Sequence, residues 1–202
     1  MRSVRRSTHP TVPPPPDERL SWLTASLEEL PSFLLAPAPF RRLDPPPFAN
    51  AEDLSLGALL LTVDALTVSA NGLTPERGAA WERARRRWES ERASHAAAIA
   101  VKAGEELRQR VNLWHAYIQD ISEKGSETAR HYSSEVRHRV IIARLAEVTG
   151  RPLEVSLDRR LAEADHALRS RFEAGAFVWE APLSRLYPQA DFWFLFGRPS
   201  MG

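Results

Sequence analysis

Residues 75–123 read PERGAAWERARRRWESERASHAAAIAVKAGEELRQRVNLWHAYIQDISE, and this stretch decides what kind of fold the chain can adopt. It has no proline after Pro75, and beyond the first turn its one glycine is Gly104. As a single helix, these 49 residues would be about 73 Å long, whereas a compact chain of 202 residues spans only about 45 Å. We therefore expect the helix either to break near residues 96–104 and fold back, or to project and pair with a partner.

The two halves of this stretch differ in their apolar pattern. The second half has one regular apolar face, at spacings of four and three, made of Leu107, Val111, Trp114, Ile118 and Ile121. The first half begins an apolar face with Trp81 and Trp88, but few apolar residues continue it. If the helix projects, its weak apolar face favours packing against a partner, often a second copy of the chain.

Helical patterns also flank this stretch. Upstream, residues 54–68 are apolar nearly all round, which predicts a helix at the centre of a bundle, with Asn50 as its N-cap. Thr74 followed by Pro75 predicts the start of the next helix. Downstream, we expect helices over residues 133–148 and 157–173, and no segment shows the sustained alternation of a strand.

Proline separates the N-terminal quarter from the rest of the chain. Eleven of the 16 prolines lie in residues 1–50, which predicts an extended arm. One short amphipathic helix over residues 17–30 interrupts it, because four leucines fall on one face: Leu20, Leu23, Leu27 and Leu30.

The last part of the chain is rich in aromatic residues. Residues 175–202 hold seven of the 17 aromatic side chains, including Phe192, Trp193, Phe194 and Phe196. Such a segment would aggregate if it were free, so we expect it to close the bundle or to dock on a partner. The predicted fold is all-α: a bundle of about four helices over residues 51–175, with a Pro-rich arm (1–50) and an aromatic tail (176–202).

Composition excludes several classes of function. The chain has no cysteine, which rules out disulfide scaffolds, Cys-ligated metals and thiol catalysis. Its formal net charge is only +1, although 25 of its 27 basic residues are arginine, and no large region is basic.

Polar residues, Asp64 among them, interrupt the apolar residues 54–73 too often to predict a membrane span. No apolar stretch follows the basic residues at the N-terminus, so we expect a cytoplasmic protein.

The sequence offers two candidate chemical sites: a repeated Glu–His spacing and the single carboxylate of Asp64. Glu135 and His138 repeat the spacing of Glu163 and His166, as in di-iron bundles, but a helical wheel turns the second pair outward, so we expect no metal site. Asp64, midway along the most apolar helix, is the best single candidate for a functional carboxylate. We expect an arginine from a neighbouring helix to pair with it. An enzyme or metal protein using Asp64, Glu135 and His138 stays an alternative.

The strongest electrostatic feature is an arginine cluster with tryptophans between its members. Trp81 and Trp88 alternate with Arg83, Arg85, Arg86, Arg87 and Arg92. Cations for phosphates and rings for bases make a nucleic-acid accessory protein one alternative. The four glutamates in residues 76–92 favour instead a solvated face laced with salt bridges.

The surplus of apolar surface favours a function in protein–protein interaction or assembly. The tail residues Phe192, Trp193, Phe194 and Phe196 are the candidate contacts, with another protein or a second copy of the chain as partner. The glycines form none of the phosphate-loop or dinucleotide-binding motifs, and we expect neither a cofactor nor catalytic residues.

Overall fold

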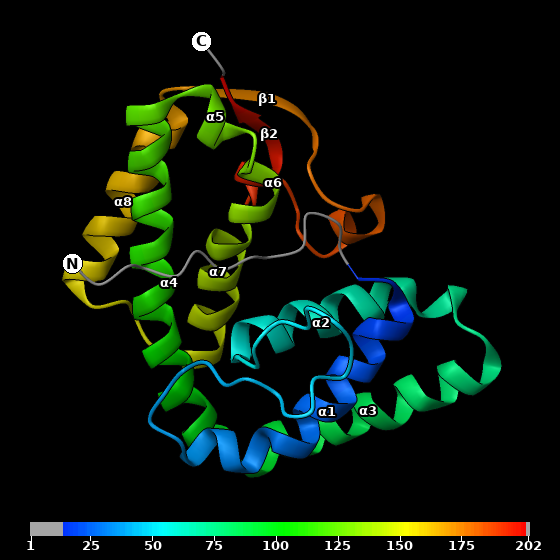
Figure 1. Cartoon of the computed structure of the whole chain (residues 1–202). Helices are drawn as coiled ribbons and strands as arrows, with labels where there is room; N and C mark the ends of the chain where they lie inside the picture. The colour runs from blue at the N-terminus through cyan, green and yellow to red at the C-terminus, as the bar shows by residue number, and fades with distance from the viewer. Residues whose placement is uncertain (1–13, 201–202) are drawn as a thin grey trace.

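The computed structural model describes residues 14–200, which form a mostly helical protein, as the sequence predicts (Figure 1). The longer helices are α1 (Pro16–Leu35), α2 (Leu56–Ser69), α3 (Pro75–Ser94), α4 (Ala96–Lys124), α7 (Arg137–Thr149) and α8 (Val155–Arg169). Short helical turns are η1 (Ala70–Gly72), α5 (Ser126–Ala129), α6 (Tyr132–Glu135), η2 (Ala181–Arg185) and η3 (Trp193–Leu195). Two strands, β1 (Phe172–Phe177) and β2 (Phe196–Pro199), form a small antiparallel sheet.

The longer helices form two groups that share one hydrophobic core. Helices α4, α7 and α8 run side by side, whereas α1, α2 and α3 lie across the lower end of α4 (Figure 1). Helix α2 joins the groups because it packs against both α1 and α7. Within residues 14–200, no helix combines the length and the hydropathy needed to cross a membrane.

The long helical stretch is divided into two helices at His95. That residue leaves helical geometry, with φ −118° and ψ 24°, and α3 and α4 leave it in different directions (Figure 1). The break falls one residue before the range in which we expected it, and Gly104 lies within α4. The apolar face of α4 from Leu107 to Ile121 is buried. The helix therefore turns instead of projecting as one rod.

Two of the predicted helix boundaries in the first half are wrong. Helix α2 begins at Leu56, because the hydroxyl of Ser55, and not Asn50, accepts a hydrogen bond from the backbone N–H of Ala58 (3.1 Å). Helix α1 continues through Pro31 to Leu35. Proline removes one backbone hydrogen bond from a helix interior, and burial of Phe33 beyond it offsets that loss. By contrast, Thr74 caps α3 as predicted.

The N-terminal part of the chain is less extended than predicted. Helix α1 belongs to the core, since Trp22, Leu23 and Leu27 are buried there. The arm was predicted over residues 1–50, and its first part, residues 1–13, lies outside the described residues.

The C-terminal segment folds back onto the helices of the same chain. The helix predicted to reach Glu173 ends at Arg169, and Phe172 begins β1 opposite Pro199 in β2. The backbone oxygen of Phe194 accepts a hydrogen bond from the buried Tyr132 hydroxyl (2.6 Å). Gly197 has φ +148°, and a Cβ there would lie 2.1 Å from a backbone oxygen of β1, so this crossing requires glycine.

Candidate functional site

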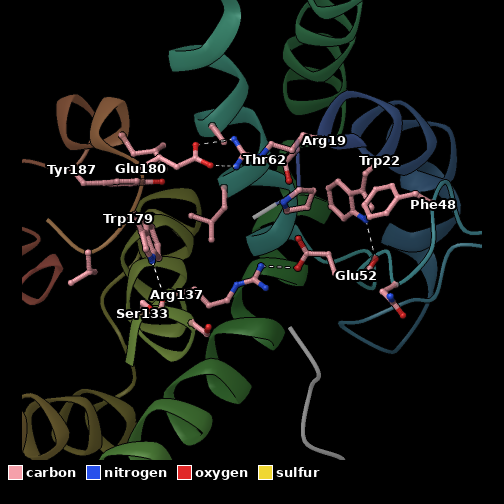
Figure 2. Close-up of a pocket in the computed structure, with 17 residues that line it drawn as sticks. Arg19, Trp22, Phe48, Glu52, Thr62, Ser133, Arg137, Trp179, Glu180 and Tyr187 are labelled. Atoms are coloured by element: carbon pink, nitrogen blue, oxygen red, sulfur yellow. Dashed lines mark hydrogen bonds and ion pairs between the residues drawn. The ribbon is translucent and has the colours of Figure 1, made fainter. Parts of the chain in front are cut away.

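A cavity of about 260 Å³ lies where the two helix groups and the C-terminal segment meet, and we call it the junction cavity (Figure 2). Its walls come from α1, the segment before α2, α2 itself, the α6–α7 turn and residues 178–187. The lining includes Trp22, Phe48, Thr62, Ser133, Trp179 and Tyr187. Trp22 and Phe48 lie on one side, and Trp179 and Tyr187 lie on the opposite side.

Two ion pairs cross the junction cavity. In one, the arginine comes from the N-terminal part of the chain, and in the other it comes from the later part. Arg19 of α1 donates to Glu180 of the C-terminal segment, with one contact of 3.1 Å. Arg137 of α7 donates to Glu52, which precedes α2, at 2.7 Å. Each pair therefore connects the N-terminal part of the wall to the later part, and the four charges sum to zero.

The aromatic rings around the junction cavity are held by hydrogen bonds that point their polar atoms into the walls. The indole Nε1–H of Trp22 donates to the backbone oxygen of Glu52 (2.9 Å), and that of Trp179 donates to the backbone oxygen of Ser133 (2.8 Å). The Trp179 and Tyr187 rings meet edge to face, with centroids 5.8 Å apart. Apolar ring surface is thus what the cavity offers to a ligand.

Asp64 lies behind this wall and is paired as predicted. Both of its carboxylate oxygens accept hydrogen bonds from Arg144 of α7, at 3.1 Å each. The Tyr187 hydroxyl donates to Asp64 Oδ2 at 2.7 Å. Burial, together with this carboxylate, raises the pKa of Tyr187 above its ordinary value, so its hydroxyl stays protonated. Asp64 therefore ties α2 to α7 and to the C-terminal segment.

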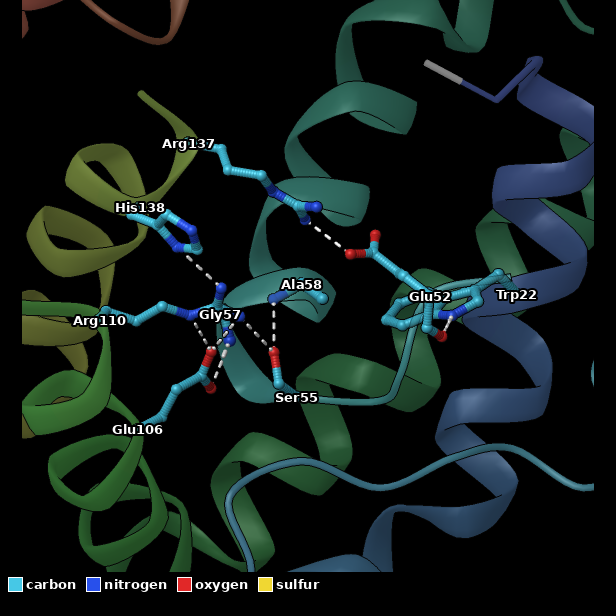
Figure 3. A network of polar contacts seen from close by, with 9 residues as sticks. All are labelled: Trp22, Glu52, Ser55, Gly57, Ala58, Glu106, Arg110, Arg137 and His138. Carbon is cyan, nitrogen blue, oxygen red and sulfur yellow. Dashed lines mark hydrogen bonds and ion pairs between the residues drawn. The ribbon is translucent and has the colours of Figure 1, made fainter. Parts of the chain in front are cut away.

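A second polar cluster is enclosed at the start of α2 (Figure 3). Glu106 of α4 is fully buried, and its carboxylate accepts a hydrogen bond from the backbone N–H of Gly57 (2.9 Å). Arg110 pairs with the same carboxylate at 2.8 Å and donates to the Ser55 hydroxyl at 3.2 Å. A carboxylate at a helix N-terminus is stabilised by the helix dipole, so the cluster anchors α2 to α4.

His138 completes this cluster as a neutral side chain. Its Nδ1 lies 3.0 Å from Nη1 of Arg110, and its Nε2 lies 3.5 Å from a carboxylate oxygen of Glu135. Burial lowers the pKa of His138 to about 4, and the nearby cations Arg110 and Arg137 act in the same direction. The imidazole thus accepts a hydrogen bond from Arg110 at neutral pH.

The other pair of the di-metal hypothesis lies elsewhere. Glu163 and His166 are exposed on α8, as the helical wheel predicted. Among residues 14–200, no group of three or more potential ligands is placed to hold a metal ion.

The arginine cluster lies on the exposed side of α3, whereas its tryptophans face the core. Trp81 and Trp88 are each only 3% exposed, so their rings are not placed to stack on nucleic-acid bases. Arg85 pairs with Glu82 (2.9 Å) and Glu89 (2.6 Å). Of the remaining arginines, Arg92 lies over Trp88, Arg86 is 4.0 Å from Glu82, and Arg83 and Arg87 are exposed.

The four aromatic residues proposed as partner contacts are covered to different degrees by the chain itself. Phe192 and Phe194 are buried in the core. Trp193 is half-buried beneath the guanidinium of Arg169 (3.7 Å to the ring centroid), and Phe196 is half-buried against Phe177.

Sequence reasoning missed the junction cavity because its walls come from five separate segments. Trp22 and Trp179 are 157 positions apart, and no local pattern links them. The density of aromatic residues after Gly175 was a usable signal, but it pointed to the Phe192–Phe196 run instead of Trp179 and Tyr187. Comparisons with protein-family models, curated proteins and solved structures gave no match.

Proposed function

We propose that this protein is a non-enzymatic protein–protein interaction module that holds a side chain of its partner in the junction cavity. The observation that carries the proposal is an apolar, aromatic-walled cavity whose charged side chains are already paired with one another. Arg19, Glu52, Arg137 and Glu180 are the charged residues of the described wall, and each lies in an ion pair. A general acid or base needs a suitable pKa and a position from which it can transfer a proton to or from a substrate. Side chains that are already held in ion pairs instead favour a site that binds a ligand without reacting with it.

The size of the cavity favours a single side chain over a whole small molecule. Sites for small molecules usually have volumes of about 300–1,000 Å³, whereas a cavity of about 150 Å³ already holds benzene. At about 260 Å³, the junction cavity lies between these values and fits one large side chain. Interfaces are commonly anchored by one such side chain in a desolvated pocket.

The rim of the cavity supports the same proposal. Asn50 is exposed and the Glu180 side chain is 39% exposed, so the cavity opens to solvent beside polar residues. An apolar pocket with a polar rim is the usual anatomy of an interface. The partner is another protein or a second copy of this chain, and the molar mass in solution distinguishes these two cases.

Selection from a random displayed-peptide library tests this function. The wild-type chain should enrich peptides that bind it, and Thr62→Phe, which fills the cavity from α2, should bind them about thirtyfold more weakly. Thr67→Phe places the same side chain on the exposed part of α2 and should bind like wild type. Enrichment of no peptide, or equal binding to both variants, would contradict the proposal.

A further inference from the structure

We propose that the side chain taken up by the junction cavity is an uncharged aromatic ring, best an indole, and that it comes from a polypeptide other than this one. This inference rests on the function proposed above and adds the chemistry of the ligand.

The charges of the wall select against a charged ligand. Arg19 and Arg137 each have a carboxylate partner, with contacts of 3.1 and 2.7 Å. An anionic ligand would have to displace Glu52 or Glu180 from its arginine, and a cationic ligand would have to displace Arg19 or Arg137 from its glutamate. An uncharged group leaves both pairs intact and loses no hydration of a charge on entering.

The shape and chemistry of the wall favour an aromatic ring over an aliphatic group. Rings line opposite sides of the cavity, with Trp22 and Phe48 facing Trp179 and Tyr187 (Figure 2). Aromatic pairs gain energy beyond the area they bury, in edge-to-face or offset geometry. Since benzene needs about 150 Å³, the cavity has room for the larger indole.

A second copy of the chain does not supply this ring. Among residues 14–200, the large hydrophobic side chains that are exposed are all aliphatic: Leu35, Val101, Val155 and Leu186. Residues 1–13 and 201–202 contain no phenylalanine, tyrosine or tryptophan. The half-buried rings of Trp193 and Phe196 are held by Arg169 and Phe177 of their own chain, so we assign the aromatic anchor to a different protein.

The indole N–H signals of the chain give a direct test by NMR titration. Each of the six tryptophans contributes one indole N–H signal, of which those of Trp22 and Trp179 report on the cavity and those of Trp81, Trp88 and Trp114 report on the core. We expect N-acetyl-tryptophanamide to shift the two cavity signals at concentrations about tenfold lower than N-acetyl-leucinamide or indole-3-acetate do. Thr62→Phe should abolish these shifts, and Thr67→Phe should keep them.

The outcomes separate this inference from the proposed function. Equal shifts from the leucine and tryptophan probes, or stronger shifts from indole-3-acetate, would overturn the aromatic, uncharged ligand. If the peptide library instead yields aliphatic anchors whose binding Thr62→Phe weakens, this inference fails and the interaction function stands. If the indole probe binds while the library yields no peptide, the polypeptide source is wrong.

Discussion

Replacement of Asp64 by asparagine should destabilise the protein by about 2–3 kcal/mol. A buried ion pair that loses one partner costs about 3–5 kcal/mol, and hydrogen bonds to charged groups contribute about 1.5–3 kcal/mol. The side chains of Asp64 and Arg144 are 10% and 29% exposed, so part of the guanidinium keeps its hydration. Arg144 also retains Glu147, and the Tyr187 hydroxyl can still donate to the amide oxygen, which lowers the expected cost.

The measurement is urea unfolding followed by far-UV circular dichroism, with the melting temperature as a second reading. For a chain of this length, a loss of about 2–3 kcal/mol lowers the melting temperature by roughly 4–12 °C. Asp191→Asn is the matched control, because Asp191 is exposed, and it should change stability by less than about 0.5 kcal/mol. An Asp64→Asn variant as stable as this control would refute the claim that the contacts of Asp64 stabilise the fold.

Two further predictions concern the cluster at the start of α2. Gly57→Ala should cost more than about 2 kcal/mol in urea unfolding, because its Cβ would lie 2.3 Å from Ile141 and 2.7 Å from Glu106. Gly104→Ala meets nothing within 4 Å in α4 and should stabilise by about 0.5–1 kcal/mol, so equal effects of the two would contradict the packing. The unfolding free energy should rise with pH between about 4 and 6.5, because there the unfolded chain protonates His138 and the folded chain does not. His138→Asn should flatten that rise, and an unchanged slope would show that His138 is not held neutral.

The helices and their buried faces were largely predictable, because they follow from local periodicity. Leu20, Leu23, Leu27 and Leu30 lie on one face of a helix by spacing alone, and all four are buried. The pairing of Asp64 with an arginine was also predictable, since an unpaired carboxylate on so apolar a helix is too costly. The identity of that arginine was not, because Arg144 is 80 positions away.

The errors arose where tertiary contacts outweigh local preference. Pro31 should end a helix, yet packing of Phe33 carries α1 past it. The β1 strand contains Gly175 and pairs with the short β2 strand only after a long connection that includes η2 and η3, so neither segment shows the alternation that would predict it. Likewise, the junction cavity forms only when α1 and the C-terminal segment meet, and no motif in either segment contains it.

The central claim is that one aromatic side chain of a partner occupies the junction cavity, and a double-mutant cycle tests it most directly. Calorimetric titration would compare a selected peptide with its aromatic-to-alanine variant, on the wild-type protein and on Thr62→Phe. We expect the alanine change to weaken binding to wild type about thirtyfold, as loss of an anchor worth about 2 kcal/mol does, and to change binding to Thr62→Phe little. An equal loss on both proteins would place the ring outside the cavity and contradict the account.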